Sequence, residues 1–309
     1  MTSKELSALD VRACASLFKT DSVEQQLPQS QERQQILQAW LETGIDLIGR
    51  QVVDLGCGQG DTVTVLGKLL QASNTAHRPK TPARLYGVDP GRLDYGAPYT
   101  LQEAQRFILE GALKDTVEFS QNDGPGFLEA HATSGKQPVN TVVMVHSIYY
   151  LPKTSTLSDI FRACRIHKVA DLLLAEWSLQ ISSLDALPHL LSVLTQDISP
   201  EHEANIRTVF TPAKIVELAN AEGYELVYEK VITPPKEMQD GAWETGGTRH
   251  RSKDLKQMEA NNEEHRILQS FQTHLDALNA AVGRLPNGKV KETRCMDVWT
   301  GVLKLKEAK

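Results

Sequence analysis

Two kinds of hydrophobic pattern divide the chain. Residues 1–50 carry apolar side chains at helical spacing, most clearly from Ser30 to Ile48, with an interruption near Gly44. Beyond residue 50, short apolar runs end in polar or glycine-rich turns, which is typical of buried strands. The predicted strands cover residues 51–56, 84–89, 116–123, 140–151, 171–178, 224–232 and 295–305. The stretches between them predict helices at residues 62–72, 101–113, 127–133, 157–166, 184–195 and 212–222.

This alternation of strands and helices predicts an α/β fold. Strands that alternate with helices form a parallel sheet covered on both faces, and right-handed crossovers make that sheet doubly wound. We therefore expect a Rossmann-like, seven-stranded, doubly wound sheet whose last strand runs antiparallel. Residues 1–50 would form an N-terminal helical segment that acts as a substrate lid, and residues 51–232 and 295–309 would form the core.

An insert at residues 233–294 separates the last two predicted strands. It contains a polar, glycine-rich stretch at 239–251, which predicts a loop, and a long helical pattern at 252–282. The sixth strand should end at the same edge of the sheet as the other parallel strands, where ligands bind in doubly wound folds. We therefore expect the insert to cover the active site, with Trp243 and His250 as lid residues. The long helix could instead be a packed outer layer.

A glycine-rich motif follows the first predicted strand. It reads Val53-Asp54-Leu55-Gly56-Cys57-Gly58-Gln59-Gly60-Asp61, and its glycines would let the backbone turn tightly and approach a ligand. The dinucleotide-binding pattern GxGxxG would require glycine at position 61, where this chain has Asp61. An acidic side chain at a helix N-terminus would repel a diphosphate. The motif therefore disfavours a dinucleotide.

Polar and aromatic residues follow the next three predicted strands. Asp89 ends the second strand, where a carboxylate can accept two hydrogen bonds from a ribose diol. It could equally be a turn residue before Pro90. Asn122 and Asp123 follow the third strand and are also common turn residues. Residues 146–150, His-Ser-Ile-Tyr-Tyr, follow the fourth strand at the ligand-binding edge, although packed aromatic residues are an alternative there.

These motifs resemble those of class I S-adenosylmethionine-dependent methyltransferases over residues 50–180. The resemblance implies S-adenosyl-L-methionine as cofactor and S-adenosyl-L-homocysteine as product. The methionine part would lie against the glycine loop, the ribose on Asp89, and the adenine amino group near residues 122 and 123. The implied cofactor-binding residues are Asp54, Gly56, Cys57, Gly58, Gly60, Asp89, Pro90, Asn122, Asp123, His146 and Ser147.

A second resemblance concerns the layout of the chain, which is similar to that of histamine N-methyltransferases. It rests on the segment 144–151, the helix and strand at 209–229, the long insert, and Ser30-Gln31-Glu32-Arg33-Gln34. In that family a glutamate binds the amine substrate, and Glu32 is the matching position. The resemblance implies methyl transfer to a small-molecule amine or ring nitrogen. Motif I of that family lacks the leading aspartate that Asp54 supplies here.

Methyl transfer from a sulfonium is an in-line displacement that requires alignment and exclusion of water. A base is needed only if the nucleophile carries a proton, and a histidine that titrates near ~6.5 could take it. Glutamates could orient a cationic amine, and aromatic rings could flank the positive methyl group. The expected catalytic residues are His146, Glu32 and Tyr149. The expected substrate-binding residues are Glu32, Arg33, Tyr150, Trp177, Trp243 and Trp299, of which Trp299 could equally belong to the core.

The composition of the chain limits the partners, metal sites and cellular location that we expect. The chain has 309 residues, of which 40% are hydrophobic, and a net charge of −6, so a basic nucleic-acid-binding surface is not expected. The cysteines, Cys14, Cys57, Cys164 and Cys295, form neither a CxxC pair nor a zinc pattern, so no metal site is expected. Without a signal peptide or a membrane-length apolar run, the expected location is the cytoplasm. The expected partner is a small-molecule substrate, neither nucleic acid nor a membrane, and the chain should be a monomer or weak homodimer.

Four other functions compete with this hypothesis. An O-methyltransferase that acts on a phenolic or carboxylic natural product would use the same fold. A protein or nucleic-acid methyltransferase is disfavoured because residues 145–150 contain no NPPY-like tetrapeptide and the chain has no basic tail. A nicotinamide-dependent oxidoreductase is disfavoured by Asp61. A cofactor-binding protein without catalysis would differ only in its lack of turnover.

Overall fold

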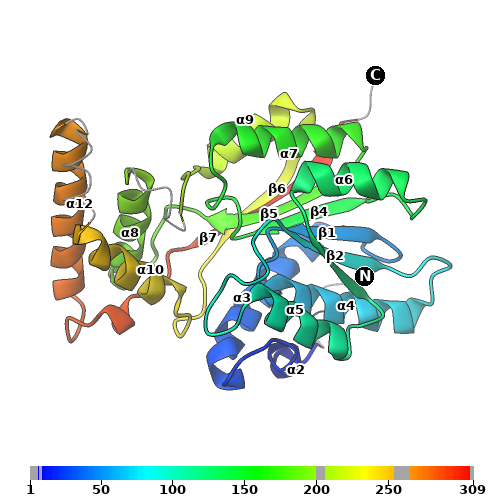
Figure 1. Ribbon diagram of the computed structural model, residues 1–309, viewed down its shortest axis with the longest axis horizontal. Helices are drawn as coiled ribbons and strands as arrows, with labels where there is room; N and C mark the ends of the chain where they lie inside the picture. The colour runs from blue at the N-terminus through cyan, green and yellow to red at the C-terminus, as the bar shows by residue number, and fades with distance from the viewer. Residues whose placement is uncertain (1–5, 7–8, 200–205, 254–264, 307–309) are drawn as a thin grey trace.

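A mixed seven-stranded sheet forms the centre of the molecule (Figure 1). The computed structural model describes residues 6, 9–199, 206–253 and 265–306. Along the sheet the strands follow the order β3-β2-β1-β4-β5-β7-β6, with β7 antiparallel to both of its neighbours. The strands are β1 (Gln51–Leu55), β2 (Arg84–Asp89), β3 (Val117–Gln121), β4 (Thr141–Val145), β5 (Asp171–Trp177), β6 (Tyr224–Ile232) and β7 (Val298–Leu305). The expected fold class and the antiparallel last strand are therefore confirmed.

Helices cover both faces of this sheet. On one face lie α6, α7 and α9, and on the other lie α2, α3, α4 and α5 (Figure 1). Their bounds are α2 (Val11–Ala15), α3 (Val23–Leu41), α4 (Asp61–His77), α5 (Leu101–Glu110), α6 (Gly124–Thr133), α7 (Thr154–Ile166) and α9 (Pro212–Ala221). Since both faces are covered, every residue of the central strands β1, β4 and β5 is buried. This burial explains why these strands appear in the sequence as continuous apolar runs.

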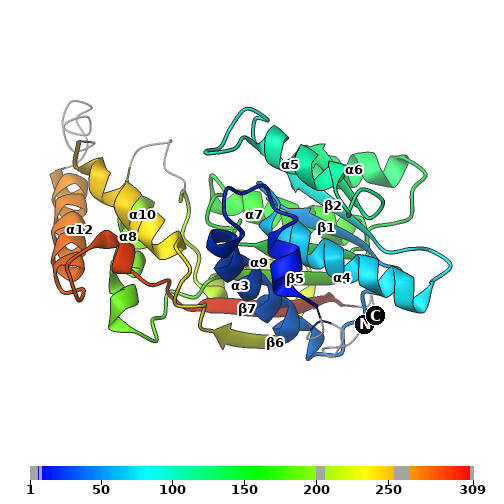
Figure 2. The same cartoon turned by 90° about the horizontal axis from the view of Figure 1, so that it is seen from below.

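A third group of helices lies beyond one end of the sheet strands, beside the rest of the molecule (Figures 1 and 2). It consists of α8 (Leu187–Asp197), α10 (Asp240–Arg249) and α12 (His265–Gly283), which pack on one another. The short 3-10 helices η1 (Leu184–Ala186), η2 (His250–Lys253) and η3 (Val290–Glu292) flank them. Apolar residues of α12, such as Phe271 and Leu278, pack in two small clusters of their own. Helix α12 is thus a packed outer layer against α8.

The stretch 239–251 is helical, so the prediction of a glycine-rich loop was wrong. Residues 240–249 form α10, and η2 follows directly. The reason is tertiary: α10 packs on α8, and a Cβ at Gly241 would lie 2.5 Å from the carbonyl oxygen of Arg294. Gly241 therefore allows a close approach between helix and backbone, which outweighs the poor helix propensity of glycine. The expected helix at 252–282 is described only from His265 on, because 254–264 lie outside the described residues.

Two alanine substitutions in α10 should shift stability in opposite directions. Gly241→Ala should destabilise the protein by about 1–3 kcal/mol, because the new methyl group collides with a backbone carbonyl. Gly247→Ala should stabilise it by about 0.5–1 kcal/mol, because nothing lies within 4 Å and alanine favours the helix. Urea denaturation of both variants measures the difference. Equal effects of the two substitutions would contradict the close packing at Gly241.

Candidate active site

The glycine loop between β1 and α4 has the backbone that its sequence suggests. Gly56, Gly58 and Gly60 all have positive φ angles, of 74°, 52° and 103°. A Cβ at Gly56 would lie 2.5 Å from the Cβ of Ser147, so no side chain fits there, although Gly56 itself is exposed. At Gly58, by contrast, a Cβ would meet nothing within 4 Å. The half-buried Gly58 therefore has free space on the side where a side chain would stand.

Asp89 joins the end of β2 to this loop. Its Oδ2 accepts a hydrogen bond from the Gly58 N–H at 2.8 Å, and its Oδ1 accepts one from the Gly91 N–H at 2.7 Å. Each oxygen keeps a further lone pair. The Asn122 N–H donates to the Asp89 carbonyl at 3.2 Å, so the structure brings the ends of β2 and β3 together.

The residues after β3 also serve the local turn. Asp123 caps α6, since its Oδ1 accepts from the Gly126 N–H at 2.7 Å. The Oδ1 of Asn122 accepts from the Asp123 N–H at 2.9 Å. Asp123 and Pro90 are exposed, whereas Asn122 is half-buried beside Asp89. Of the two residues expected near the adenine, the geometry favours Asn122.

Helix α3 brings two buried charged side chains, Glu32 and Arg33, to the same edge of the sheet. Glu32 is fully buried, and its carboxylate accepts hydrogen bonds from Arg33 and from Nε2 of His146, the latter at 2.8 Å. On the other side of the ring, Nδ1 of His146 lies 3.5 Å from Oε1 of Glu176. The imidazole also stacks on Trp177, with ring centroids 4.1 Å apart. His146 is thus held between two carboxylates and an indole.

Glu176 organises the backbone around this imidazole. Its Oε2 accepts from the N–H groups of Ile148 and Tyr149, at 2.9 and 3.2 Å, and its Oε1 accepts from the Trp177 N–H at 2.9 Å. His146 itself has a positive φ of 48°, a conformation that non-glycine residues adopt rarely and at some cost. The carboxylate therefore holds the strained turn after β4 in place.

The two carboxylates determine the charge of His146. Burial alone would lower its pKa, but Glu32 and Glu176 outweigh that effect and raise the pKa to about 9. Burial likewise opposes ionisation of Glu32, but Arg33 and His146 lower its pKa overall. At neutral pH the pair is an imidazolium and a carboxylate. A protonated imidazole cannot accept a proton, so the expected role of His146 as a general base does not fit this geometry.

The expected catalytic role of Tyr149 does not fit its contacts either. Its hydroxyl is buried and lies 2.8 Å from the carbonyl of Trp177 and 2.9 Å from that of Phe210. Burial raises its pKa above the usual range. A single phenol proton shared between two backbone carbonyls leaves nothing for a substrate. Tyr149 therefore anchors the chain segment after β4.

The aromatic residues expected at the substrate differ in how close the structure brings them to His146 and the carboxylates near it. Trp177 packs on His146, and Tyr150 is 46% exposed within electrostatic range of Glu176, Asp240 and Glu244. Trp299 is buried, and its indole N–H donates to Glu229 at 2.9 Å, toward the β6 edge of the sheet. The structure therefore does not bring Trp299 to His146, and its alternative role as a core residue fits better.

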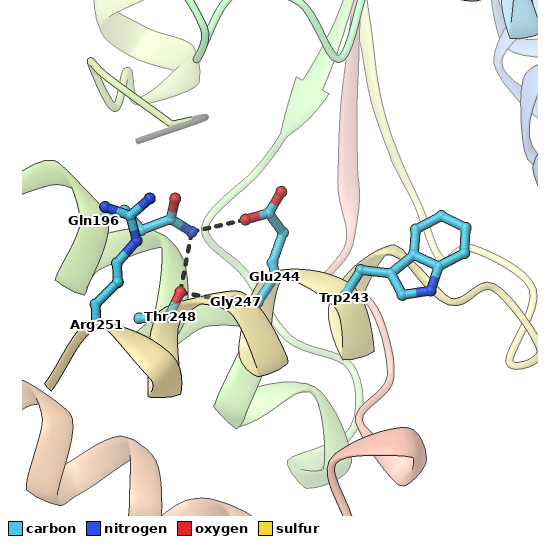
Figure 3. A pocket seen from close by; sticks show the side chains of 6 residues that line it. All are labelled: Gln196, Trp243, Glu244, Gly247, Thr248 and Arg251. Atoms are coloured by element: carbon cyan, nitrogen blue, oxygen red, sulfur yellow. Dashed lines mark hydrogen bonds between the residues drawn. The ribbon is translucent and has the colours of Figure 1, made fainter. Parts of the chain in front are cut away.

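The expected lid residues lie on the outer part of α10. Trp243 is 63% exposed, and Figure 3 shows its side chain extending away from its neighbours in a small cavity of about 100 Å³. Nδ1 of the exposed His250 lies 2.7 Å from the Gly246 carbonyl. In the same cavity, Glu244 accepts a hydrogen bond from the Gln196 amide at 2.7 Å (Figure 3). The side chains that reach inward come instead from the first turn of α10.

Several residues that the sequence analysis did not single out face the same region. The Gln26 amide donates to Asp61 Oδ1 at 2.6 Å, and the Gln29 amide lies 3.4 Å from Asp240 Oδ2. His189 stands edge-on to Trp177, with ring centroids 4.7 Å apart. Gln29 and Asp240 are 211 positions apart in the chain, so no local pattern could have linked them.

Several buried polar atoms in this region have no hydrogen-bond partner among the described residues, including His146 Nδ1 and His189 Nε2. Those on α3 and β1 next to the glycine loop are Gln29 Oε1, Ser30 Oγ, Arg33 Nε and Asp54 Oδ2. Burial raises the pKa of Asp54 to about 7, although Arg33 opposes the shift. Buried polar groups are rarely left unpaired, and a polar ligand would satisfy them. The atoms lie on α3 and β1, next to the glycine loop, so the residues present fit a ligand with both charged and polar groups.

Solved structures and curated proteins place this arrangement in a known fold. A cyclopropane-fatty-acyl-phospholipid synthase-like protein from Lactobacillus casei matches with a TM-score of 0.74 and 23% identity, covering 98% of this chain and 100% of that one. The methyltransferases phomM' and phomM of Diaporthe leptostromiformis are each 26% identical over 287 residues, which is 80% of this chain and 71% of theirs. No family model matches the chain. The chain has the class I methyltransferase fold.

The described residues contain no group of three or more histidine, cysteine, aspartate or glutamate side chains arranged to hold a metal ion. A helix with the length and apolar character for crossing a membrane is likewise not found among them.

Titration of His146 should be visible in the stability of the protein. A folded-state pKa of about 9, above the unfolded value of ~6.5, stabilises the fold fully below pH ~6.5, and this contribution is lost as the pH rises through 9. Wild type should therefore exceed His146→Gln in unfolding free energy by about 3 kcal/mol more at pH 6.5 than at pH 10. Urea denaturation across this range measures the change.

His189 provides the matched control. It is also buried against Trp177, but burial and the nearby His146 lower its pKa to about 3, so it stays neutral throughout the range. The stability difference between wild type and His189→Gln should change by less than about 0.5 kcal/mol over the range, and in the opposite direction, because near pH 6.5 only the unfolded histidine begins to bind a proton. A difference for His146→Gln that is equally flat would show that His146 is not an imidazolium.

Proposed function

We propose that the protein is an S-adenosylmethionine-dependent methyltransferase whose acceptor is a small-molecule amine or ring nitrogen. The observation that carries the proposal is the contact between the glycine loop and Asp89, with unpaired buried polar atoms on the neighbouring α3 and β1, in a class I methyltransferase fold. The methyltransferase names of both curated relatives support it. Asp61 at the start of α4 disfavours a dinucleotide in the same site.

The residues present can hold the methyl donor by its separate parts. Asp89 has free lone pairs for a ribose diol, and Asn122 lies beside it for the base. The charged methionine part would face the half-buried Gly58, the buried carboxyl of Asp54 and the guanidinium of Arg33. When bound, this donor supplies a methyl group already activated by the positive sulfonium. The protein then has to align the acceptor and exclude water.

The charge of the site supports an acceptor that is neutral or cationic. Carboxylates outnumber cations: Glu32 is neutralised by Arg33 and His146, whereas Asp54, Asp61 and Asp240 have no ion pair of their own among the described residues. Burial raises the pKa of Asp240, which indicates that its charge is incompletely balanced. An anionic acceptor would add repulsion to this excess.

The protonated state of His146 supports nitrogen rather than oxygen as the methylated atom. A phenol needs a base to become a good nucleophile, and the imidazolium cannot provide one. A ring nitrogen or a free amine attacks through a lone pair that it already carries. In this proposal Glu32 and Glu176 are positioning residues that hold the imidazolium and the Trp177 indole against the acceptor.

Removal of the Asp89 carboxylate should weaken cofactor binding selectively. Asp89→Ala should bind S-adenosylhomocysteine about 1–3 kcal/mol less tightly, because ribose hydroxyls and the Gly58 N–H both lose their acceptor. Isothermal calorimetry measures the loss, with nicotinamide adenine dinucleotide as a ligand that wild type should not bind. Asp94→Ala, at an exposed carboxylate that pairs with Arg92, is the control. Unchanged affinity in Asp89→Ala would reject the ribose assignment.

Wild-type protein should transfer the methyl group of S-adenosylmethionine to amines. We expect turnover with imidazoles at neutral pH, and with aryl-alkylamines only at a pH where their amine is unprotonated. Turnover with phenols and benzoates should be much slower, because the site excludes negative charge and lacks a free base. Release of S-adenosylhomocysteine measures the rate, and mass spectrometry locates the methyl group. Turnover confined to phenols or carboxylates would contradict the nitrogen acceptor while leaving the methyltransferase class intact.

A further inference from the structure

Asp240 is the point at which the insert reaches the site. It is the first residue of α10, and its Oδ2 lies 3.4 Å from the amide nitrogen of Gln29 on α3. Its carboxylate is close enough to Arg33, His146, Glu32 and Asp61 for each of them to act on its pKa. A residue of the late insert therefore stands among residues that the N-terminal helix and the sheet supply.

Among the described residues, no cation lies within ion-pair distance of the Asp240 carboxylate. Arg33 and His146 are near enough to lower its pKa, but each forms its ion pair with Glu32. The next carboxylate along the same face of α10, Glu244, differs because the Gln196 amide donates to it at 2.7 Å (Figure 3). Among the described residues, Asp240 forms no ion pair, and its weak contact with Gln29 is long for a charge-assisted hydrogen bond.

A second acceptor lies beside this carboxylate. Gln29 is only 4% exposed, and the amide that faces Asp240 carries an Oε1 that is buried and has no partner. The hydroxyl oxygen of the neighbouring Ser30 is also buried and unpartnered. A carboxylate and an amide oxygen side by side require a donor with several N–H groups and a positive charge. An ammonium group has both properties.

We propose that Asp240 and Gln29 form a binding site for an ammonium group, which α10 completes over the active site. The inference deepens the proposed function, because the ammonium would belong to the methionine part of the methyl donor or to the acceptor. In the acceptor it would be a nitrogen other than the methylated one, since an ammonium has no lone pair. We expect the acceptor, since Asp240 comes from the insert between β6 and β7, whereas the loop expected to hold the methionine part follows β1.

The test compares Asp240→Asn with Glu237→Gln, which makes the same change of charge at an exposed side chain three positions earlier. Calorimetry measures binding of S-adenosylhomocysteine and of its analogue without the α-amino group. It then measures binding of phenethylamine and histamine to the protein saturated with S-adenosylhomocysteine. Asp240→Asn should lose about tenfold in affinity for the amines and less than about twofold for S-adenosylhomocysteine. Gln29→Met should show the same selectivity to a smaller degree.

A second outcome would also support the ammonium site, but with the amino group of the methyl donor as its ligand in place of the acceptor. In that case Asp240→Asn loses affinity for S-adenosylhomocysteine but not for the analogue that lacks the amino group. The inference is overturned if no probe distinguishes Asp240→Asn from Glu237→Gln, or if both nucleosides lose affinity equally. Failure of wild type to bind S-adenosylhomocysteine at all would instead refute the proposed function.

Discussion

The buried ion pair between Glu32 and His146 is the contact on which the rest of the site depends. It joins α3 to the turn after β4, two segments 114 residues apart, at 2.8 Å. A buried carboxylate without partners is costly, so α3 must lie where Arg33 and His146 can both reach Glu32. The same helix carries Gln29 and Ser30, whose buried polar atoms have no partner among the described residues.

The same contact changes what the site can do chemically. An imidazole free of carboxylates would be a neutral base near pH 7, whereas between Glu32 and Glu176 it is an imidazolium. The site thus favours binding and alignment over proton abstraction. Methyl transfer to a nitrogen lone pair needs little more than that, because the sulfonium carries the activation. The excess of carboxylates around Arg33 is consistent with ligands that bring positive charge.

The residues that the sequence predicted at strand ends differ in whether their polar atoms are already hydrogen-bonded within the protein. Asp89 and Trp177 end β2 and β5, and His146 directly follows β4, so all three lie at the carboxyl ends of parallel strands, where a ligand site is expected. Tyr149 and Trp299 occur at comparable positions, yet their polar atoms bond to backbone carbonyls and to Glu229. Periodicity locates such residues on an edge or a face of the sheet. It does not say which partner completes their hydrogen bonds.

The amino-acid sequence by itself determined the alternation of strands and helices and the turn at the glycine loop, because burial periodicity and glycine backbone freedom act over a few residues. Only the tertiary structure decided that residues 240–251 are helical, since Gly241 packs directly on the backbone of Arg294 and Cys295, far along the chain. It also decided the charge of His146 and the place of Asp240. Desolvation and Coulomb interactions act through space, between groups that the chain order keeps far apart.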